Sequence, residues 1–264
     1  MIDTKIPATL AILTRNSGKT LERALESAKA FDDIIICDGG STDNTLDIAA
    51  SFGARVIAQD PKYLKDGKIF DYALVRNQTL DAAKHSWFFF LDSDEYCGQD
   101  LIDAIRNNVS TRSGGAFWVN RKYVIHGKVI DCAATYPNRQ MRFFSRNSAQ
   151  RFIKQIHERI QLKADVAPEF LSGTMYIPFD PDIVAIRRKW NYQIAVAAEQ
   201  ARPLSLGGFL WGALQTAKVS LLWLFRLVRN SIFCSGTKMP LKFEMERHYF
   251  HFRLLRALWH EVRF

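Results

Sequence analysis

The sequence predicts an α/β protein with a doubly wound, mixed and mainly parallel sheet, followed by a helical C-terminal extension. Short apolar runs at residues 7–13, 33–37 and 87–91 alternate with segments of helical periodicity. This alternation is typical of strands joined by crossover helices in a parallel sheet. From residue 187 onward, basic and aromatic residues at helical spacing replace the alternation, and this change predicts the extension.

The first half of the chain predicts three strand–helix pairs before a fourth strand. Glycines such as Gly40 and Gly53 stand between the elements, where tight turns require their conformational freedom. Asn16 or Ser17 can serve as the N-cap of the first helical segment, and Ser41, Thr42 or Asp43 as that of the second. In order, we expect a strand at 7–13, a helix with apolar residues at 21, 24, 25 and 28, a strand at 33–37, a helix through Ala50, a strand at 55–58, a polar loop at 59–69 and a helix at 71–84.

Residues 87–96 read WFFFLDSDEY, so an apolar run ends abruptly in Asp92, Asp94 and Glu95. The run predicts a strand buried on both faces, and open α/β sheets bind ligands at the carboxyl ends of such strands. Asp92 and Asp94 are two residues apart, so both side chains can point toward one site. Two carboxylates suit Mg²⁺ or Mn²⁺, although Ser93 or Asp94 as a helix N-cap is the alternative.

The second half of the predicted domain is richer in strands. A helix at 100–109 follows the acidic turn, and a pair of strands within 116–132 surrounds a turn at 126–128. Further strands are expected at 140–145 and 158–162. The simplest arrangement is a mixed sheet that closes over the parallel one.

The composition excludes several classes of protein. The chain has 264 residues, of which 48% are hydrophobic and 24% charged, as in an ordinary folded protein. It begins without a basic leader and apolar segment, so we expect no secretory signal. The four cysteines, which form no C-x-x-C pair, argue against a zinc knuckle or a disulfide scaffold and indicate a reducing cytoplasm. They are Cys37, Cys97, Cys132 and Cys234.

Polar turns at three strand ends, containing Thr14, Asp38 and the Asp92–Asp94 pair, are expected to line one crevice. An acidic residue after the second strand is where dinucleotide-binding folds hold a ribose. The first turn, TRNSGKT, lacks both the G-x-G-x-x-G and the P-loop pattern, which argues against NAD enzymes and P-loop enzymes. A metal ion is therefore expected to neutralise a bound diphosphate.

Six stretches occur in order over roughly residues 6–162: TRNSGKTLERALES, IIICDGGSTDNTLDIA, RNQTL, WFFFLDSDEY, YPNRQMRFF and QIHERI. In this ordered set the chain resembles the family 2 glycosyltransferases of the GT-A fold, and among them the bacterial lipopolysaccharide-core type of β-glycosyltransferase. The resemblance implies an enzyme that moves a sugar from a nucleotide-diphosphate sugar to an acceptor hydroxyl. It also implies inversion at the anomeric carbon and a divalent metal, Mn²⁺ or Mg²⁺, at the D-x-D motif.

The resemblance assigns the donor side of the site. Thr14 and Asp38 would contact the nucleobase and ribose, and Asp43 would shape that turn. Arg76 would approach the diphosphate, with a solvated helix face as its alternative. Ser17 stands where the family usually has Glu.

The metal and the acceptor side follow from the same resemblance. Asp94 would bind the metal directly, and Asp92 would be a second ligand nearer the ribose. Arg142 would border the acceptor and could bind phosphate, with a plain ion pair as the alternative. Glu158 would be the general base unless it pairs with Arg159. His157 would contact metal or phosphate unless it is a half-buried structural residue.

Other features bear on the kind of transfer. The histidine often found after the family's His-Glu pair is missing from SGTMYIPFDPD, which removes a further metal ligand. The Q-x-x-R-W signature of processive synthases is also missing, with QMRF in the nearest position, so transfer of a single sugar is favoured.

The C-terminal extension carries the charge. From residue 187 there are 13 basic and four acidic residues, which account for the whole net charge of +9. Residues 203–225 contain one charged residue, Lys218. Their character leaves three alternatives open: a helix at the membrane interface, a helix packed on the catalytic body, or a transmembrane span. We favour the first, and expect no nucleic-acid partner because no RNA-binding motif occurs.

Together these features predict a catalytic domain at 1–186 and a membrane-associating extension at 187–264. The nucleotide-sugar half would be about 1–96 and the acceptor half about 97–186. We expect a UDP-sugar donor, a glycan or glycolipid acceptor, and a cytoplasmic enzyme peripheral to the inner face of the cell membrane. A nucleotidyltransferase and a non-catalytic protein that binds membrane surfaces are the alternatives.

Overall fold

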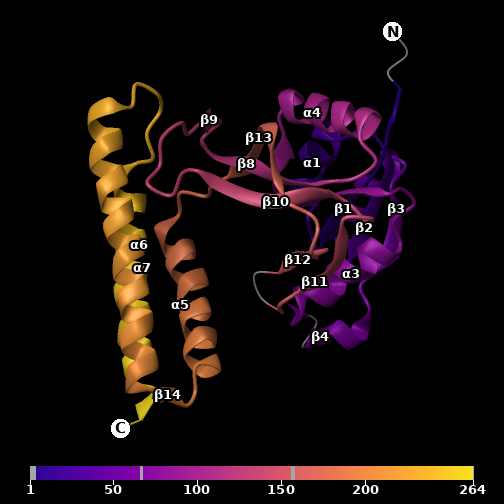
Figure 1. Cartoon of the computed structure of the whole chain (residues 1–264). Helices are drawn as coiled ribbons and strands as arrows, with labels where there is room; N and C mark the ends of the chain where they lie inside the picture. Colours follow the sequence, from indigo (N-terminus) through magenta and orange to yellow (C-terminus); the bar gives the residue numbers. More distant parts are fainter. Residues whose placement is uncertain (1–3, 66–67, 156–157, 264) are drawn as a thin grey trace. The chain divides into compact units, whose positions relative to one another are not determined.

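The computed structural model describes residues 4–65, 68–155 and 158–263 and divides the chain into two compact units. The first unit comprises Met1–Lys122 and Asn138–Pro178, and the second comprises Tyr123–Pro137 and Phe179–Phe264. Figure 1 traces the chain through both. Residues 123–137 therefore group with the C-terminal helices, whereas the sequence places them in the catalytic domain. The division at residue 186 remains a prediction.

The core of the first unit is a parallel sheet. Four strands lie side by side in the order β3 (Arg55–Ala58), β2 (Phe31–Asp38), β1 (Ile6–Thr14) and β6 (Trp87–Asp92). Every pairing among them is parallel. Because parallel strands need crossover connections, helices lie between successive strands, as the alternation predicts.

Helices cover both faces of this sheet. Phe89 and Leu91 of β6 point into a core shared with α1 (Leu21–Ser27), α2 (Thr45–Ser51) and α4 (Gln99–Thr111). Phe88 and Phe90 point into a second core with α3 (Tyr72–Asp81). Alternate residues of one strand thus lie in opposite cores, which explains why the run WFFFL is apolar throughout.

Antiparallel strands extend the sheet beyond β6. The order continues through β10 (Asn138–Ser145), β8 (Ala116–Ile125), β13 (Glu169–Pro178) and β7 (Tyr96–Cys97), and β9 (Lys128–Val129) pairs with β8. Within the described residues this sheet has nine strands. Its mixed, partly parallel character confirms the predicted fold class.

Two smaller hairpins stand apart from the main sheet, and not all of these strands were predicted. β11 (Ala149–Ile153) pairs with β12 (Arg159–Leu162), and β4 (Leu64–Lys65) with β5 (Lys68–Ile69), next to a 3₁₀ helix at Pro61–Tyr63. β4, β5, β11 and β13 escaped prediction, and β4 and β5 lie within residues 59–69, where a polar loop was expected. Burial along β13 does not alternate between successive residues, and Gly173 interrupts the strand with a positive φ of 94°. The apolar residues of this strand therefore do not recur at every second position.

The second unit is built from long helices. α7 (Leu241–Trp259) packs against both α5 (Ile183–Gln200) and α6 (Leu206–Phe233), and the short strands β14 (Leu204–Ser205) and β15 (Val262–Arg263) pair with each other. Phe179 and Phe243 meet edge to face in its core. Among the described residues, no helix is long and apolar enough to cross a membrane.

A disulfide joins Cys132 to Cys234 within the second unit, so the expectation that the cysteine pattern argues against disulfides is wrong for this pair. The two residues are 102 positions apart in the chain yet their Cα atoms lie 6.6 Å from each other. Such proximity depends on tertiary folding, which cysteine spacing does not reveal. Cys37 and Cys97 are free and buried, and burial raises the pKa of each thiol to about 12.

A buried carboxylate ties the sheet together at the edge where its parallel strands begin. Asp33 of β2 accepts a hydrogen bond from Thr9 Oγ1 of β1 at 2.8 Å and another from the backbone N–H of Lys84 at 3.0 Å. Arg55 of β3 donates through Nε at 2.8 Å and Nη2 at 3.0 Å. Burial raises the pKa of Asp33, but these partners together lower it by more, so its pKa lies below the ordinary value of 3.8.

We expect Asp33→Asn to lower the free energy of unfolding by about 1–3 kcal/mol at neutral pH, because it replaces a buried, charge-assisted network with a neutral amide. The folded-state pKa of Asp33 is below its unfolded value of about 3.9. The carboxylate therefore stabilises the protein above that value, and this contribution is lost as the pH falls through the folded-state pKa. Urea denaturation across this range should show the two proteins converging on acidification; a constant difference would contradict the assignment.

Candidate functional site

The predicted site residues come from the carboxyl ends of three neighbouring strands. β1 ends at Thr14, which is paired in register with Asp38 at the end of β2. On its other side, Leu13 is paired with Asp92 at the end of β6. The structure thus brings the three polar turns to one edge of the sheet.

Asp38 organises the turn that follows β2. The carboxylate is buried and accepts hydrogen bonds from Thr14 Oγ1 at 2.8 Å, from Ser41 Oγ at 2.5 Å and from the backbone N–H groups of Gly40 and Ser41 at 2.9 and 2.7 Å. Gly40 has a φ of +81°, a conformation that favours glycine. Thr14 and Asp38 are therefore held together at the ends of neighbouring strands.

Asp43 locks the second turn to the first. Its Oδ2 accepts from the backbone N–H of Gly18 at 3.0 Å, and its Oδ1 accepts from Thr45 Oγ1 at 2.5 Å. The hydrogen bond from Thr45 is the main reason that the pKa of Asp43 lies below its usual value. A Cβ at position 18 would meet Oδ1 of the exposed Asn44 at 1.8 Å, so a larger residue there would have to displace that side chain.

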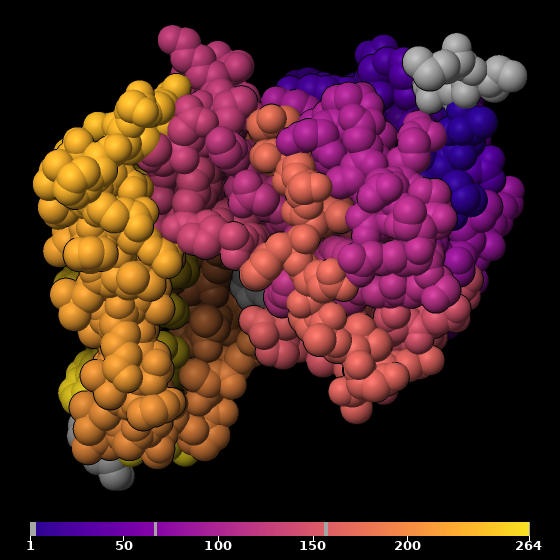
Figure 2. All heavy atoms as spheres, turned by 45° about the horizontal axis from the view of Figure 1, so that its top comes forward, coloured from indigo at the N-terminus to yellow at the C-terminus, as the bar shows by residue number. Residues whose placement is uncertain are grey.

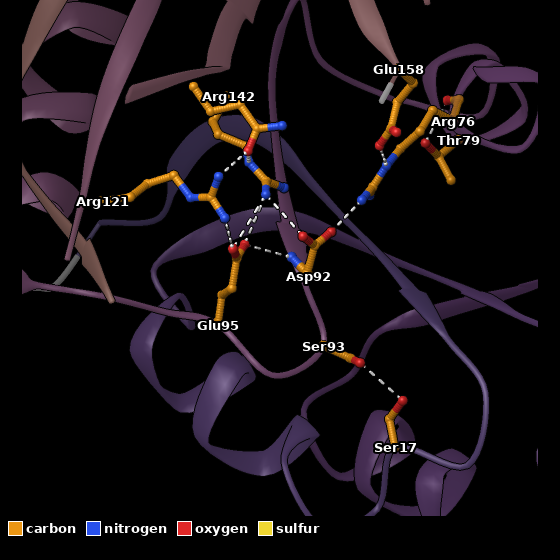
Figure 3. Close-up of polar contacts among 10 residues, drawn as sticks. Ser17, Arg76, Thr79, Asp92, Ser93, Glu95, Arg121, Arg142 and Glu158 are labelled. Atoms are coloured by element: carbon orange, nitrogen blue, oxygen red, sulfur yellow. Dashed lines mark hydrogen bonds and ion pairs between the residues drawn. The ribbon is translucent and has the colours of Figure 1, made fainter. Parts of the chain in front are cut away.

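The acidic turn after β6 lies against a group of arginines (Figure 3). Asp92 accepts from Arg76 Nη2 at 2.5 Å through Oδ1 and from Arg142 Nη2 at 2.9 Å through Oδ2. Glu95 is buried and forms ion pairs with Arg121 at 2.7 Å and Arg142 at 3.0 Å. We call these five residues the arginine–carboxylate cluster.

The arginines of the cluster hold the pKa of Asp92 low. Desolvation raises the pKa of Asp92, but Arg142 and Arg76 lower it by more, so its pKa lies far below 3.8 and the group stays ionised. Both guanidiniums also lie over the ring of Phe90, Arg76 at 4.7 Å and Arg142 at 4.5 Å from its centroid. Arg76 is therefore not on a solvated helix face.

The arginines have hydrogen-bonding capacity that the cluster does not use. Among the described residues, Nη1 of Arg76, Nη1 of Arg142 and Nε of Arg121 are buried without a hydrogen-bond partner. Buried donors without partners are costly. These three atoms are thus suited to receive the oxygens of an anionic ligand.

Glu158, the residue directly before β12, reaches the same cluster. Its carboxylate lies 3.5 Å from Arg76 Nε, and its side chain is 15% exposed. The ion-pair partner is thus Arg76, where the sequence left Arg159 open. His157, the other predicted residue of this segment, lies outside the described residues.

Asp94 is the exposed carboxylate of the acidic turn. Both oxygens of Asp92 already accept from arginines, and no cluster of three or more His, Cys, Asp or Glu side chains able to hold a metal occurs in the described ranges. Mg²⁺ is often held by one or two carboxylates together with substrate phosphates and water. These residues fit a cation held by Asp94 and completed by the substrate better than a cation enclosed by protein.

Sequence reasoning missed Arg121. It donates to Glu95 and to Gln140 Oε1, the latter at 2.7 Å. Phe117 and Val119, which share its face of β8 at intervals of two residues, are buried. The spacing of Arg121 from these two apolar residues of a predicted strand could have indicated that its charge is buried. A second missed contact is the hydrogen bond from Ser17 Oγ to Ser93 Oγ at 3.0 Å, which joins the first turn to the acidic turn.

Comparison with known proteins identifies a family. The sequence profile of glycosyl transferase family 2 matches residues 9–158. A TPR repeat-containing protein of Synechococcus elongatus is 30% identical over 152 residues, which cover 57% of this chain and 34% of that protein. An uncharacterized glycosyltransferase of Rickettsia bellii is 33% identical over 95 residues, covering 36% of this chain and 30% of that protein. The chain thus spans about a third of the length of these curated relatives.

Among solved structures, S. aureus TarS 1-349 in complex with UDP-GlcNAc is similar to this chain with a TM-score of 0.45 and 14% identity. The alignment covers 97% of this chain and 81% of that one.

We expect Glu95→Ala to lower the free energy of unfolding by about 3–5 kcal/mol, because Arg121 and Arg142 would be left buried without this carboxylate. Glu169→Ala is the matched control, since Glu169 pairs with Arg112 at the surface, where both side chains are about half exposed. That variant should change the free energy of unfolding far less, because solvent screens an exposed ion pair. Urea denaturation measures the free energy of unfolding of both variants. Equal decreases would show that the arginine–carboxylate cluster stabilises the fold no more than a surface ion pair does.

Proposed function

This chain belongs to glycosyl transferase family 2, as its ordered motifs predict, and we propose that it moves one sugar from a nucleotide-diphosphate sugar to an acceptor hydroxyl with inversion at the anomeric carbon. The observation that carries the proposal is the arginine–carboxylate cluster beside the turns of Thr14 and Asp38. Its buried guanidinium nitrogens without partners suit the oxygens of a diphosphate. The coverage of family 2 over residues 9–158 supports the same chemistry.

The donor would bind along the strand ends. Thr14 and Asp38 would hold the nucleoside, with Asp38 exchanging one of its turn hydrogen bonds for a ribose hydroxyl. Arg76 would take the diphosphate through its Nη1, and Asp43 would keep the two turns in place. We favour a UDP-sugar, as the resemblance suggests.

A divalent cation, Mn²⁺ or Mg²⁺, would be held by Asp94. Such an ion neutralises charge on the departing diphosphate and orients it. Asp92, although proposed as a second ligand nearer the ribose, has both oxygens on arginines and would first have to release one of them. We therefore propose that Asp94 binds the metal and that Asp92 positions Arg76 and Arg142.

Glu158 would act as the general base. It would take the proton of the acceptor hydroxyl as the oxygen attacks the anomeric carbon and the nucleotide diphosphate leaves from the opposite face. Arg76 contacts both Glu158 and Asp92, so a single side chain links the base to the diphosphate side of the site. His157 would contact phosphate or metal.

The acceptor side is bordered by Arg142, whose Nη1 is buried without a partner. We propose a glycan or glycolipid acceptor at the inner face of the cell membrane, of the kind used in lipopolysaccharide biosynthesis. Because the processive Q-x-x-R-W signature is replaced by QMRF, one sugar would be added at each encounter.

Asp94→Ala should reduce metal-dependent turnover at least about 100-fold, because charge on the leaving diphosphate would lose its stabilisation. The protein should remain folded, since Asp94 is exposed. A thermal-shift panel of UDP, GDP, CDP and dTDP sugars with Mn²⁺ identifies the donor, and release of the nucleotide diphosphate with and without EDTA then measures turnover. Asp47→Ala, at another exposed carboxylate, should leave turnover unchanged. Unchanged turnover in Asp94→Ala would remove its metal role.

Glu158→Gln should slow transfer by about 10²–10⁴-fold, the usual contribution of a general base, with donor affinity almost unchanged. Glutamine can still accept a hydrogen bond from Arg76, so the site should keep its shape. Calorimetric titration of the donor separates binding from chemistry, and Glu169→Gln is the exposed control. If Glu158→Gln loses donor binding instead, Glu158 is a structural or donor-site residue.

A further inference from the structure

Helix α6 is apolar on two opposite faces. One face packs on α7, where Phe209 meets Trp259 with ring centroids 5.1 Å apart and Trp223 stacks on His251 at 4.9 Å. Ser220 Oγ lies 2.6 Å from His251 Nδ1 in the same contact. Yet none of the 28 residues of this helix is buried. In Figure 2, α6 is the column of spheres that grades from orange to gold, and its outward side is uncovered in that view.

The opposite face carries a continuous row of large apolar side chains, which we call the α6 stripe. Its members recur at intervals of three, four or seven residues, so they share one side of the helix. They are 48–67% exposed, and the row extends over roughly 33 Å. The α6 stripe consists of Leu210, Leu214, Leu221, Phe225, Val228 and Ile232.

Cations and a tryptophan border the stripe. Trp211, Lys218 and Arg229 are exposed and fall on one edge of the stripe, at intervals of seven and eleven residues. Residues 206–233 contain no Asp or Glu to balance the cations. Tryptophan beside basic residues along an apolar face is the arrangement of helices that lie in a membrane interface.

The neighbouring helix α7 adds to this imbalance. Its acidic side chains, Glu244 and Glu246, are buried; Glu244 accepts from the backbone N–H of Ala134 at 2.7 Å, and Glu246 pairs with Arg187. Lys242 and Arg256 of the same helix are exposed. Helix α6 thus has no acidic group and those of α7 are internal, while basic groups of both helices remain at the surface.

We propose that the α6 stripe inserts between the headgroups of an anionic phospholipid surface, with α6 parallel to the membrane plane. Charge complementarity selects this occupant, because the basic border would attract anionic lipid and would repel the same border of a second copy. The other face of α6 packs on α7, so only one side of the helix can meet lipid, and this favours the in-plane orientation. The proposal deepens the proposed function, since it names the surface that would bring the site to a membrane-bound acceptor.

Flotation of the full chain with vesicles tests the proposal without any sugar donor, so sugar transfer and membrane binding can fail separately. We expect binding to phosphatidylcholine vesicles that contain phosphatidylglycerol and much weaker binding to phosphatidylcholine alone. Leu221→Ser/Phe225→Ser should lower partitioning at least about tenfold, since both side chains lose their apolar contact with lipid. Phe170→Ser/Val56→Ser, at exposed apolar residues of the first unit, should change nothing.

A second variant tests the charges. Lys218→Gln/Arg229→Gln should lower partitioning onto anionic vesicles by about tenfold or more and weaken its dependence on salt, with little change on neutral vesicles. Circular dichroism confirms that each variant is folded; all substituted side chains are exposed.

Four outcomes would overturn the proposal. The wild-type chain would fail to bind anionic vesicles, or the stripe variant would bind as well as the wild type. Alternatively, light scattering without lipid would show a dimer that Leu221→Ser/Phe225→Ser converts to a monomer, which would make the stripe an interface between two copies. Resistance of the bound chain to extraction by alkaline carbonate would contradict the in-plane orientation.

Discussion

The first unit depends on the burial of two arginines at the end of an apolar strand. The side chains of Arg76 and Arg142 are 3% and 2% exposed, so each needs a carboxylate nearby to offset its desolvation. Asp92 serves both, and Glu95 holds Arg142 together with Arg121. This requirement fixes three elements around β6, because Arg76 comes from α3, Arg121 from β8 and Arg142 from β10.

The same constraint separates the duties of the acidic turn. Both oxygens of Asp92 hold guanidiniums, so in the proposed site Asp92 would position the arginines and the exposed Asp94 would meet the cation. The donors are oriented before any ligand arrives, and groups fixed in advance stabilise developing charge without reorganising. The packing of Arg76 and Arg142 on Phe90 adds to this rigidity.

Local patterns predicted the parallel half of the fold and its turns, because a strand buried on both faces and a capped helix leave signals within a few residues. Asp38 and Asp43 act on their own turns and were found for that reason. The partners of Arg76 and the Cys132–Cys234 disulfide join segments 16 to 102 residues apart, and no local pattern records such pairs. The exposure of α6 could not be predicted either, because an apolar helix has the same sequence pattern whether its face is packed against protein or open to solvent.

The uneven charge of the chain fits two different tasks. Residues 1–186 hold equal numbers of basic and acidic residues, so the region with the proposed donor site exerts little long-range attraction on anions. An anionic donor would instead be recognised at short range, by buried guanidiniums in a low dielectric where each contact is strong. The whole excess of +9 lies beyond residue 186, most of it on helices whose exposed cations act over about a Debye length, the range at which an anionic surface is felt. In the proposed arrangement, this separation of charge would let the extension respond to a membrane while the donor site remains selective for its ligand.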